Sequence, residues 1–126
     1  MQERKPNSKH ERQYIEQGSC CVYCNESVSY EDVTIDHFLP KKKGGKQVCN
    51  LVYSCHKCNG LKGHKSIEEF REVCFTKIAH ILDSVANKQN WKMSEKQLIK
   101  FKRLVAILKS TQIIIKNGCK PLKLFN

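Results

Sequence analysis

The sequence has no long apolar run and few acidic residues in its C-terminal third. No stretch approaches the roughly 20 apolar residues of a membrane-spanning helix, which argues against a membrane protein. The first residues are polar, so we expect no secretory signal and an intracellular location. Low-complexity tracts are absent and 40% of the residues are hydrophobic, which excludes a compositionally disordered chain. A length of 126 residues predicts one domain with a modest core and an appendage.

The shortage of acids leaves a formal net charge of +11, from 23 lysines and arginines against 12 aspartates and glutamates. After Asp83 the only acid is Glu95, whereas lysines continue through that whole stretch. Such an excess points to a polyanionic partner, although a merely lysine-rich solvated surface would give the same count. Anionic lipid would also attract these bases, but nothing else in the sequence indicates lipid. We therefore expect a polyanion, and no membrane, as the partner.

Cysteine is abundant, with eight residues. In a chain without a signal peptide, paired cysteines indicate zinc rather than disulfides. Cys21 and Cys24 form one C-x-x-C pair, and Cys55 and Cys58 form a second. Two intervening residues let both sulfurs of a pair face one ion, and four thiolates complete the tetrahedron that zinc favours. These four cysteines are predicted to hold a structural zinc; Cys20 is a rival to Cys21 with a poorer spacing.

Local patterns predict two strands and a helix within this cysteine-rich segment. The β-branched residues Val33–Ile35 follow polar turn residues and would form a strand that delivers Asp36 and His37 at its end. An earlier strand over Cys21–Tyr23 would pair with it as a hairpin. The apolar positions within Asn50–Lys62 are compatible with a short helix, so the predicted order is strand, strand, helix.

Capping signals predict amphipathic helices on either side of that segment. Serine followed three residues later by glutamate or glutamine stands at each helix start, and apolar residues then recur at three- and four-residue steps. One helix would end at Gly18, and two more would cover 66–87 and 94–109. Ile113–Ile115 could form a short strand or an apolar tail. The predicted organisation is an N-terminal segment (1–18), a zinc-stapled core (19–65) and a basic helical extension (66–126).

The core segment carries a series of motifs in a specific order: Asp36-His37, Pro40, Gly44-Gly45, Asn50-Leu51, Cys58-Asn59 and Lys62. Together they resemble the HNH endonuclease family, in the branch whose core is flanked by two zinc-binding cysteine pairs. The resemblance covers about residues 19–65. It implies an α+β fold with a ββα-metal (His-Me finger) core and structural zinc, here followed by C-terminal amphipathic helices. It also implies a metal-dependent endonuclease that hydrolyses phosphodiester bonds of DNA.

The resemblance implies a role for each matched residue. His37 would be the general base that activates water, and Asp36 and Asn59 would hold a divalent cation, Mg²⁺ or Mn²⁺. Asn50 would support the loop around His37. Elementary chemistry agrees, because histidine titrates near neutral pH and hard cations prefer oxygen ligands. Adjacent strand residues point to opposite faces, so Asp36 and His37 can serve one site only where the strand ends or twists.

Basic residues near the site and in the extension are expected to contact DNA phosphates: Lys41, Lys42, Lys43, Lys62, Lys96, Lys100 and Arg103. Lys62 could instead have a structural role. Parts of the family place a histidine directly after this lysine, where this chain has Gly63, so the role of His64 stays open.

Two alternatives to a nuclease also stay open: a non-catalytic zinc-binding nucleic-acid-binding module, and a protein-interaction domain built on the helical tail. A single site cuts one strand at a time, so cleavage of both strands could require a homodimer, for which the apolar C-terminal stripe could provide the interface.

Overall fold

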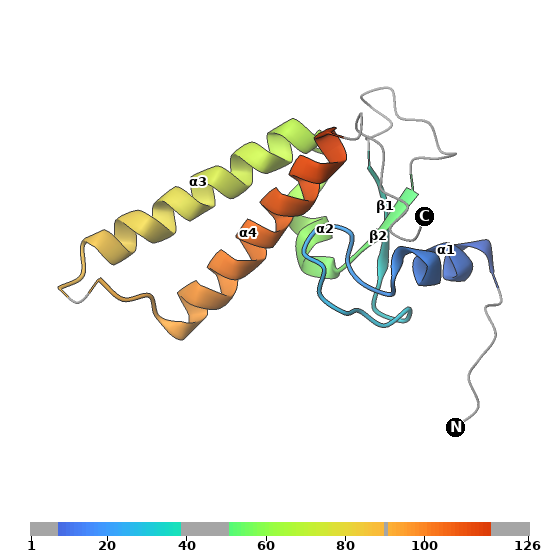
Figure 1. Ribbon diagram of the computed structural model, residues 1–126, viewed down its shortest axis with the longest axis horizontal. Helices are drawn as coiled ribbons and strands as arrows, with labels where there is room; N and C mark the ends of the chain where they lie inside the picture. The colour runs from blue at the N-terminus through green and yellow to red at the C-terminus, as the bar shows by residue number, and fades with distance from the viewer. Residues whose placement is uncertain (1–7, 39–50, 90, 117–126) are drawn as a thin grey trace.

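The computed structural model describes residues 8–38, 51–89 and 91–116. Its elements follow the order α1, β1, β2, α2, α3, α4. Figure 1 shows that α3 and α4 lie side by side as a long helical hairpin, while α1 and the sheet lie at one end of it, with α2 between the two parts. Among the described helices, none is both long and apolar enough to cross a membrane.

Helix α1 (Lys9–Gln17) begins and ends where the sequence predicted. The Ser8 hydroxyl accepts a backbone N–H from the first turn, and Gly18 closes the helix at φ 109°, a left-handed conformation that glycine adopts without strain. The Gln17 amide then donates to the carbonyl of Tyr53 (2.7 Å) and accepts from its backbone N–H (3.0 Å). The end of α1 is therefore bound to β2.

The β-hairpin joins β1 (Thr34–His37) to β2 (Leu51–Ser54), which pair antiparallel. The predicted helix over Asn50–Lys62 was therefore wrong in its first half, because α2 (His56–Lys62) begins only after Cys55. The apolar residues of β2 are also compatible with a buried strand, and periodicity cannot separate the two readings over so short a run. Pairing with β1 decides in favour of the strand.

The predicted strand over Cys21–Tyr23 was also wrong. This segment is a turn in which the backbone N–H of Asn25 donates to the carbonyl of Cys21 (2.9 Å), with Asn25 at φ 63°. A regular strand would point alternate side chains to opposite faces. A C-x-x-C pair that binds one metal ion must instead direct the sulfurs of Cys21 and Cys24 toward the same position. A turn brings the two sulfurs to the same side of the backbone.

The two long helices are α3 (Ile67–Ala86) and α4 (Glu95–Lys116). Ser66 caps α3 in the capping box that the sequence predicted. Helix α4 passes its predicted end, so the expectation of a strand or tail over Ile113–Ile115 was wrong.

The longer helix has a packing explanation. Ile107, Thr111 and Ile114 continue one buried stripe at steps of four and three residues. The Thr111 hydroxyl donates to the carbonyl of Ile107 (2.7 Å), and Arg71 of α3 donates to that hydroxyl. The last turns of α4 are thus held against α3.

A single cluster of buried residues joins the sheet region to the helical hairpin. At its centre the rings of Tyr23 and Phe70 meet edge to face, with centroids 5.3 Å apart. Cysteines, Phe38 and Val52 from one side meet Leu104, Ile107 and other apolar residues from the helices. The cluster crosses the predicted boundary between residues 65 and 66, and the domain division stays a prediction.

Replacing Phe70 with alanine is predicted to lower the free energy of unfolding by about 3–5 kcal/mol, because the ring is fully buried and leaves a cavity. Phe75→Ala on the same helix is the matched control, because that ring is 54% exposed. Urea denaturation of the zinc-loaded protein, followed by circular dichroism, measures both. Equal losses for the two variants would contradict the central position of Phe70.

Candidate functional site

The metal site predicted from the sequence is present as one cluster of four cysteines. Each of Cys21, Cys24, Cys55 and Cys58 offers a sulfur, and these sulfurs all lie within 4.8 Å of one another. Cys20 is not part of the cluster, because its thiol donates to the carbonyl of Gly18. The structure thus selects Cys21 over its rival.

Both cysteine pairs have the local geometry of a zinc knuckle. The backbone N–H of Cys24 points at the sulfur of Cys21 (3.5 Å), and that of Cys58 points at the sulfur of Cys55 (3.5 Å). Cys55 is also the N-cap of α2, which puts the second pair in the first turn of a helix. Such N–H groups stabilise negative charge on sulfur.

Hydrogen bonds among the four cysteines favour the thiolate form of Cys21 over its thiol form. Hydrogen bonds from the thiols of Cys24 and Cys58 lower the pKa of Cys21 to about 4. Donation to Cys21, together with burial, raises the pKa of Cys58 above its ordinary value. Four sulfurs with one proton already displaced fit a tetrahedral Zn²⁺, and four protein ligands leave no open coordination position. The donor set therefore indicates a structural zinc site.

The Asp–His pair lies at the end of β1, where the sequence placed it. Asp36 is 7% exposed, and its Oδ2 accepts a hydrogen bond of 2.6 Å from the Tyr23 hydroxyl. The ammonium of Lys62 lies 3.2 Å from the same oxygen. Burial, followed by the Asp36 carboxylate, raises the pKa of Tyr23 well above 10, so the hydroxyl keeps the proton that it donates. The other carboxylate oxygen, Oδ1, has no hydrogen-bond or ion-pair partner among the described residues.

His37 is the last residue of β1 and shares the same lysine. Lys62 donates to the carbonyl of His37 (3.0 Å), so one buried ammonium links the backbone of His37 to the carboxylate of Asp36. The Nε2 atom of His37 is buried, and within the described part of the chain it has no hydrogen-bond partner. Asn59 lies one turn before Lys62 on α2, on the same face of the helix, and is half-buried.

The other predicted DNA-contacting residues have varied positions. Lys96 and Lys100 are exposed on α4, whereas Arg103 lies 3.4 Å from Glu26. Lys62 is fully buried, which favours its structural alternative over a phosphate contact. Asn50 and Lys41–Lys43 lie outside the described residues. His64 is exposed on the turn after α2.

Sequence reasoning missed Tyr23. It lies inside the first C-x-x-C pair, where only the cysteines carried a recognisable signal. Its position between two zinc ligands turns it inward to Asp36, a non-local contact that residue spacing does not encode.

A two-stranded antiparallel hairpin followed by a helix, with an Asp–His pair ending the first strand and a four-cysteine cluster beside it, defines a zinc-stapled ββα-metal fold. The comparison with known families agrees. Residues 21–75 match a family model described as HNH endonuclease.

Two curated relatives match a longer part of the chain. It is 25% identical over 104 residues to the CRISPR-associated endonuclease Cas9 of Actinomyces naeslundii, covering 76% of this chain and 9% of that protein. It is 24% identical over 82 residues to the CRISPR-associated endonuclease Cas9 of Corynebacterium diphtheriae, covering 63% of this chain and 8% of that protein. The chain thus spans less than a tenth of the length of these relatives.

Metal analysis of the purified protein is expected to find about one zinc per chain. Cys58→Ser should lose it, because the cluster then lacks one thiolate. Cys74→Ser is the matched control: Cys74 is also fully buried, but it lies on α3 outside the cluster. Zinc-free wild-type protein, or undiminished zinc in Cys58→Ser, would contradict the assignment.

Proposed function

We propose that this chain is a metal-dependent endonuclease that hydrolyses phosphodiester bonds of DNA, with His37 as the general base. The observation that carries the proposal is the match of residues 21–75 to the HNH endonuclease family model, combined with the position of Asp36 and His37 at the end of β1. The net charge of +11 suits a polyanionic substrate.

His37 is suited to move a proton. Its Nε2 has no hydrogen-bond partner among the described residues, so in the tautomer that carries the proton on Nδ1 this atom would accept a proton from a water that reaches it. The oxygen of that water then bonds to phosphorus, the ester P–O bond breaks, and the leaving oxygen acquires a proton. The hydrogen bond from Lys62 to the carbonyl of His37 fixes the backbone from which the imidazole projects.

Asp36 and Asn59 carry oxygen donors of the kind that a hard divalent cation prefers. Asp36 would supply Oδ1, and Asn59 would supply its side-chain carbonyl, both of which suit Mg²⁺ or Mn²⁺. Such an ion supplies Lewis-acid chemistry and charge neutralisation at the phosphate. Because only two protein ligands would bind the ion, coordination positions would be left for substrate and water.

Tyr23 and Lys62 would be positioning residues. The Tyr23 hydroxyl donates to Oδ2 of Asp36 and the Lys62 ammonium forms an ion pair with the same oxygen, so together they fix the carboxylate and direct its other oxygen away from them. They also stabilise a negative charge that burial would otherwise penalise.

One observation favours the non-catalytic alternative, a zinc-binding nucleic-acid-binding module. The ammonium of Lys62 already neutralises the Asp36 carboxylate at 3.2 Å and would repel a second cation. The nuclease proposal requires that Oδ1 remains a sufficient ligand, and a cleavage assay decides between the two functions.

In a plasmid-nicking assay with added Mg²⁺ or Mn²⁺, His37→Ala is expected to lower the cleavage rate by about 10²-fold or more, because the general base is lost. His80→Ala on the exposed side of α3 is the control and should cut like the wild type. Equal cutting by His37→Ala and wild type would remove His37 from its role. No cutting by any protein, over several metals and substrates, would favour the binding module.

Tyr23→Phe tests the positioning role. Losing a buried hydrogen bond to a charged group should cost about 1.5–3 kcal/mol of unfolding free energy. The Mn²⁺ concentration that gives half-maximal cleavage should also rise, because the Asp36 carboxylate is less firmly held. Tyr30→Phe is the control, since it removes only a hydroxyl contact with Ser8. An unchanged Mn²⁺ requirement in Tyr23→Phe would leave Tyr23 a purely structural residue.

A further inference from the structure

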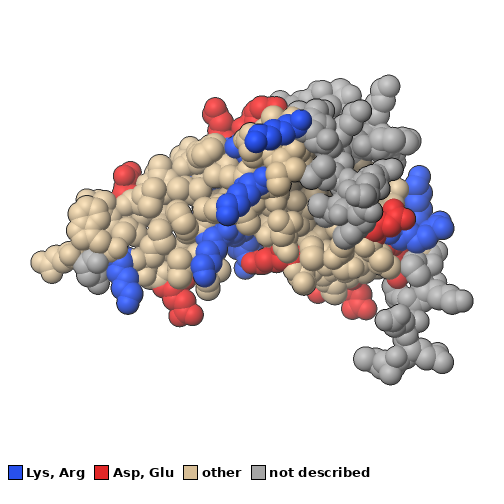
Figure 2. Space-filling model, in the orientation of Figure 1, with Lys and Arg blue, Asp and Glu red and all other residues tan. Residues whose placement is uncertain are grey.

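The helical hairpin separates its charges between its two helices. Helix α3 carries both signs, with acids at Glu68, Glu69, Glu72 and Asp83. Helix α4 has one acid, Glu95 in its first turn, and bases along the rest of its length: Lys96, Lys100, Lys102, Arg103, Lys109 and Lys116. In Figure 2 a row of basic side chains crosses the face over α4, while acidic ones gather along the edge over α3. The positive charge therefore belongs to one side of the hairpin.

Within α4, the bases divide by helix face. Lys102, Lys109 and Lys116 recur every seven residues, which is about two helical turns, so they lie on one exposed face. Lys100 lies roughly 160° around the helix from Lys102 and shares the stripe of Leu104, which is buried toward α3. Lys102 and Lys109 thus point outward from the hairpin, whereas Lys100 points to its α3 side.

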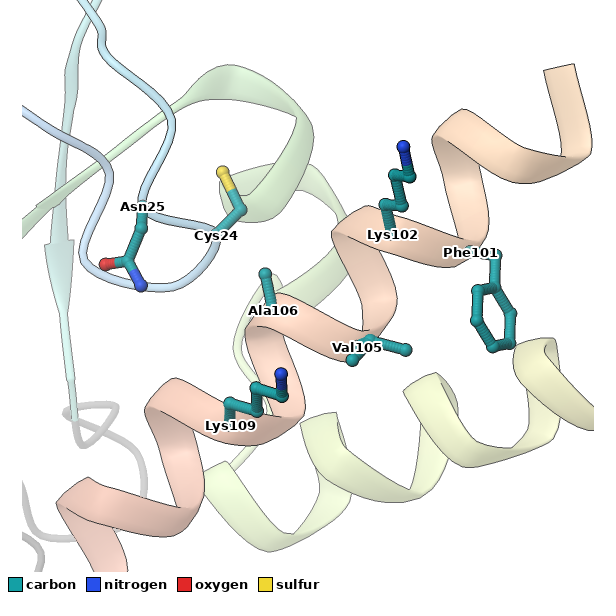
Figure 3. A pocket seen from close by; sticks show the side chains of 7 residues that line it. All are labelled: Cys24, Asn25, Phe101, Lys102, Val105, Ala106 and Lys109. Carbon is teal, nitrogen blue, oxygen red and sulfur yellow. The ribbon is translucent and has the colours of Figure 1, made fainter. Parts of the chain in front are cut away.

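An open groove of about 350 Å³ runs between this face and the turn of the first C-x-x-C pair. This turn, residues 21–25, is called the zinc knuckle below. Lys102 and Lys109 line it from α4, with Ala106 between them, and Cys24 and Asn25 line it from the knuckle. Figure 3 shows Lys102, Ala106 and Lys109 projecting to the same side of α4, beside the loop that carries Cys24 and Asn25. The groove therefore has basic residues along one wall and a metal-binding loop along the other.

Two contacts hold the knuckle beside α4. The side-chain amide of Asn25 donates to the hydroxyl of Ser110 (3.2 Å). Arg103 pairs with Glu26 at 3.4 Å. These contacts use Arg103 internally, whereas Lys102 and Lys109 are exposed and have no ion-pair partner in the described part of the chain. Two unpaired lysines on a rigid wall repel each other, and a polyanion would relieve that repulsion.

The spacing of the row suits a nucleic-acid strand. Seven residues of α-helix rise about 10.5 Å. Lysine side chains are long and flexible, so two ammonium groups at about this separation can each contact a different phosphate of the same backbone. The groove floor of Val105 and Ala106 adds no charge that would repel a phosphate.

We propose that the face of α4 formed by Lys102 and Lys109, together with the zinc knuckle, binds the phosphate backbone of DNA. The inference rests on the proposed function for its choice of DNA as the polyanion. It assigns DNA contact to the outward face of α4 rather than to Lys96 and Lys100, which the sequence alone favoured. Binding of this kind is independent of base sequence.

The test compares two double variants in a His37→Ala background: Lys102→Gln with Lys109→Gln, and Lys96→Gln with Lys100→Gln. Both remove two positive charges from the same helix. Fluorescence anisotropy with a labelled DNA duplex, without added Mg²⁺ or Mn²⁺, measures affinity across a salt series. The first variant should bind roughly tenfold more weakly, and the slope of log affinity against log salt should fall by about 2, because two phosphate contacts are lost.

The second variant should change affinity by less than about twofold. Equal weakening of both variants would mean that net charge alone matters, and unchanged affinity in the first would overturn the proposed surface. A cleavage assay on the wild-type protein, which retains His37, tests the proposed nuclease function separately from the DNA-binding surface. A protein that cuts DNA while Lys102→Gln with Lys109→Gln binds normally disproves only the surface. A protein that never cuts but shows the expected binding difference retains the surface and loses the nuclease.

Discussion

The convergence of four cysteine sulfurs is the constraint on which the rest of the structure depends. It joins the turn after α1 to the start of α2, two segments that are remote in sequence. The sheet beside it has only two strands of four residues each, which is too small to be stable in isolation. Structural zinc in small domains contributes about 10–16 kcal/mol, as much as the total stability of a typical protein. A metal at this cluster would therefore fix the positions of β2, α2 and the knuckle together.

The buried charges beside the cluster are a second consequence of that arrangement. A carboxylate and an ammonium in the interior seldom add stability, because each loses its hydration. Here Asp36 accepts a hydrogen bond from the Tyr23 hydroxyl of the knuckle. It also forms an ion pair with the Lys62 ammonium of α2. Both donors come from segments that the cysteines hold in place. A polar network of this kind, kept at the end of a strand, is typical of a site whose geometry matters more than its stability.

The helical hairpin combines packing with surface charge. Phe70 of α3 and Leu104 of α4 face the core and meet the knuckle through Tyr23 and the cysteines. The outward side of α4 is left to basic residues. One pair of helices therefore completes the core of the zinc-stapled region and also presents a positive surface next to it. The hairpin and the family segment overlap along α3, since the matched residues 21–75 extend into that helix.

Several features could be predicted from the sequence because local spacing encodes them. Two C-x-x-C pairs identified the four cysteines, serine caps located the starts of α1 and α3, and an apolar period identified the long helices. The order of the Asp–His pair, the asparagines and the cysteine pairs indicated the family whose model residues 21–75 match. The roles proposed for His37, Asp36 and Asn59 follow from the same order of motifs.

What only the tertiary structure decided depends on contacts between distant residues. The strand that pairs with β1 is Leu51–Ser54 rather than Cys21–Tyr23, since the knuckle forces the latter into a turn. Lys62 is a buried partner of Asp36, although its sequence context equally suited a surface phosphate contact. The sequence by itself determined which cysteines form the four-sulfur cluster and where most helices begin, because those properties follow from spacing along one chain. Which surfaces meet, and hence which charges are buried and which lysines face outward, was decided only by the packed structure.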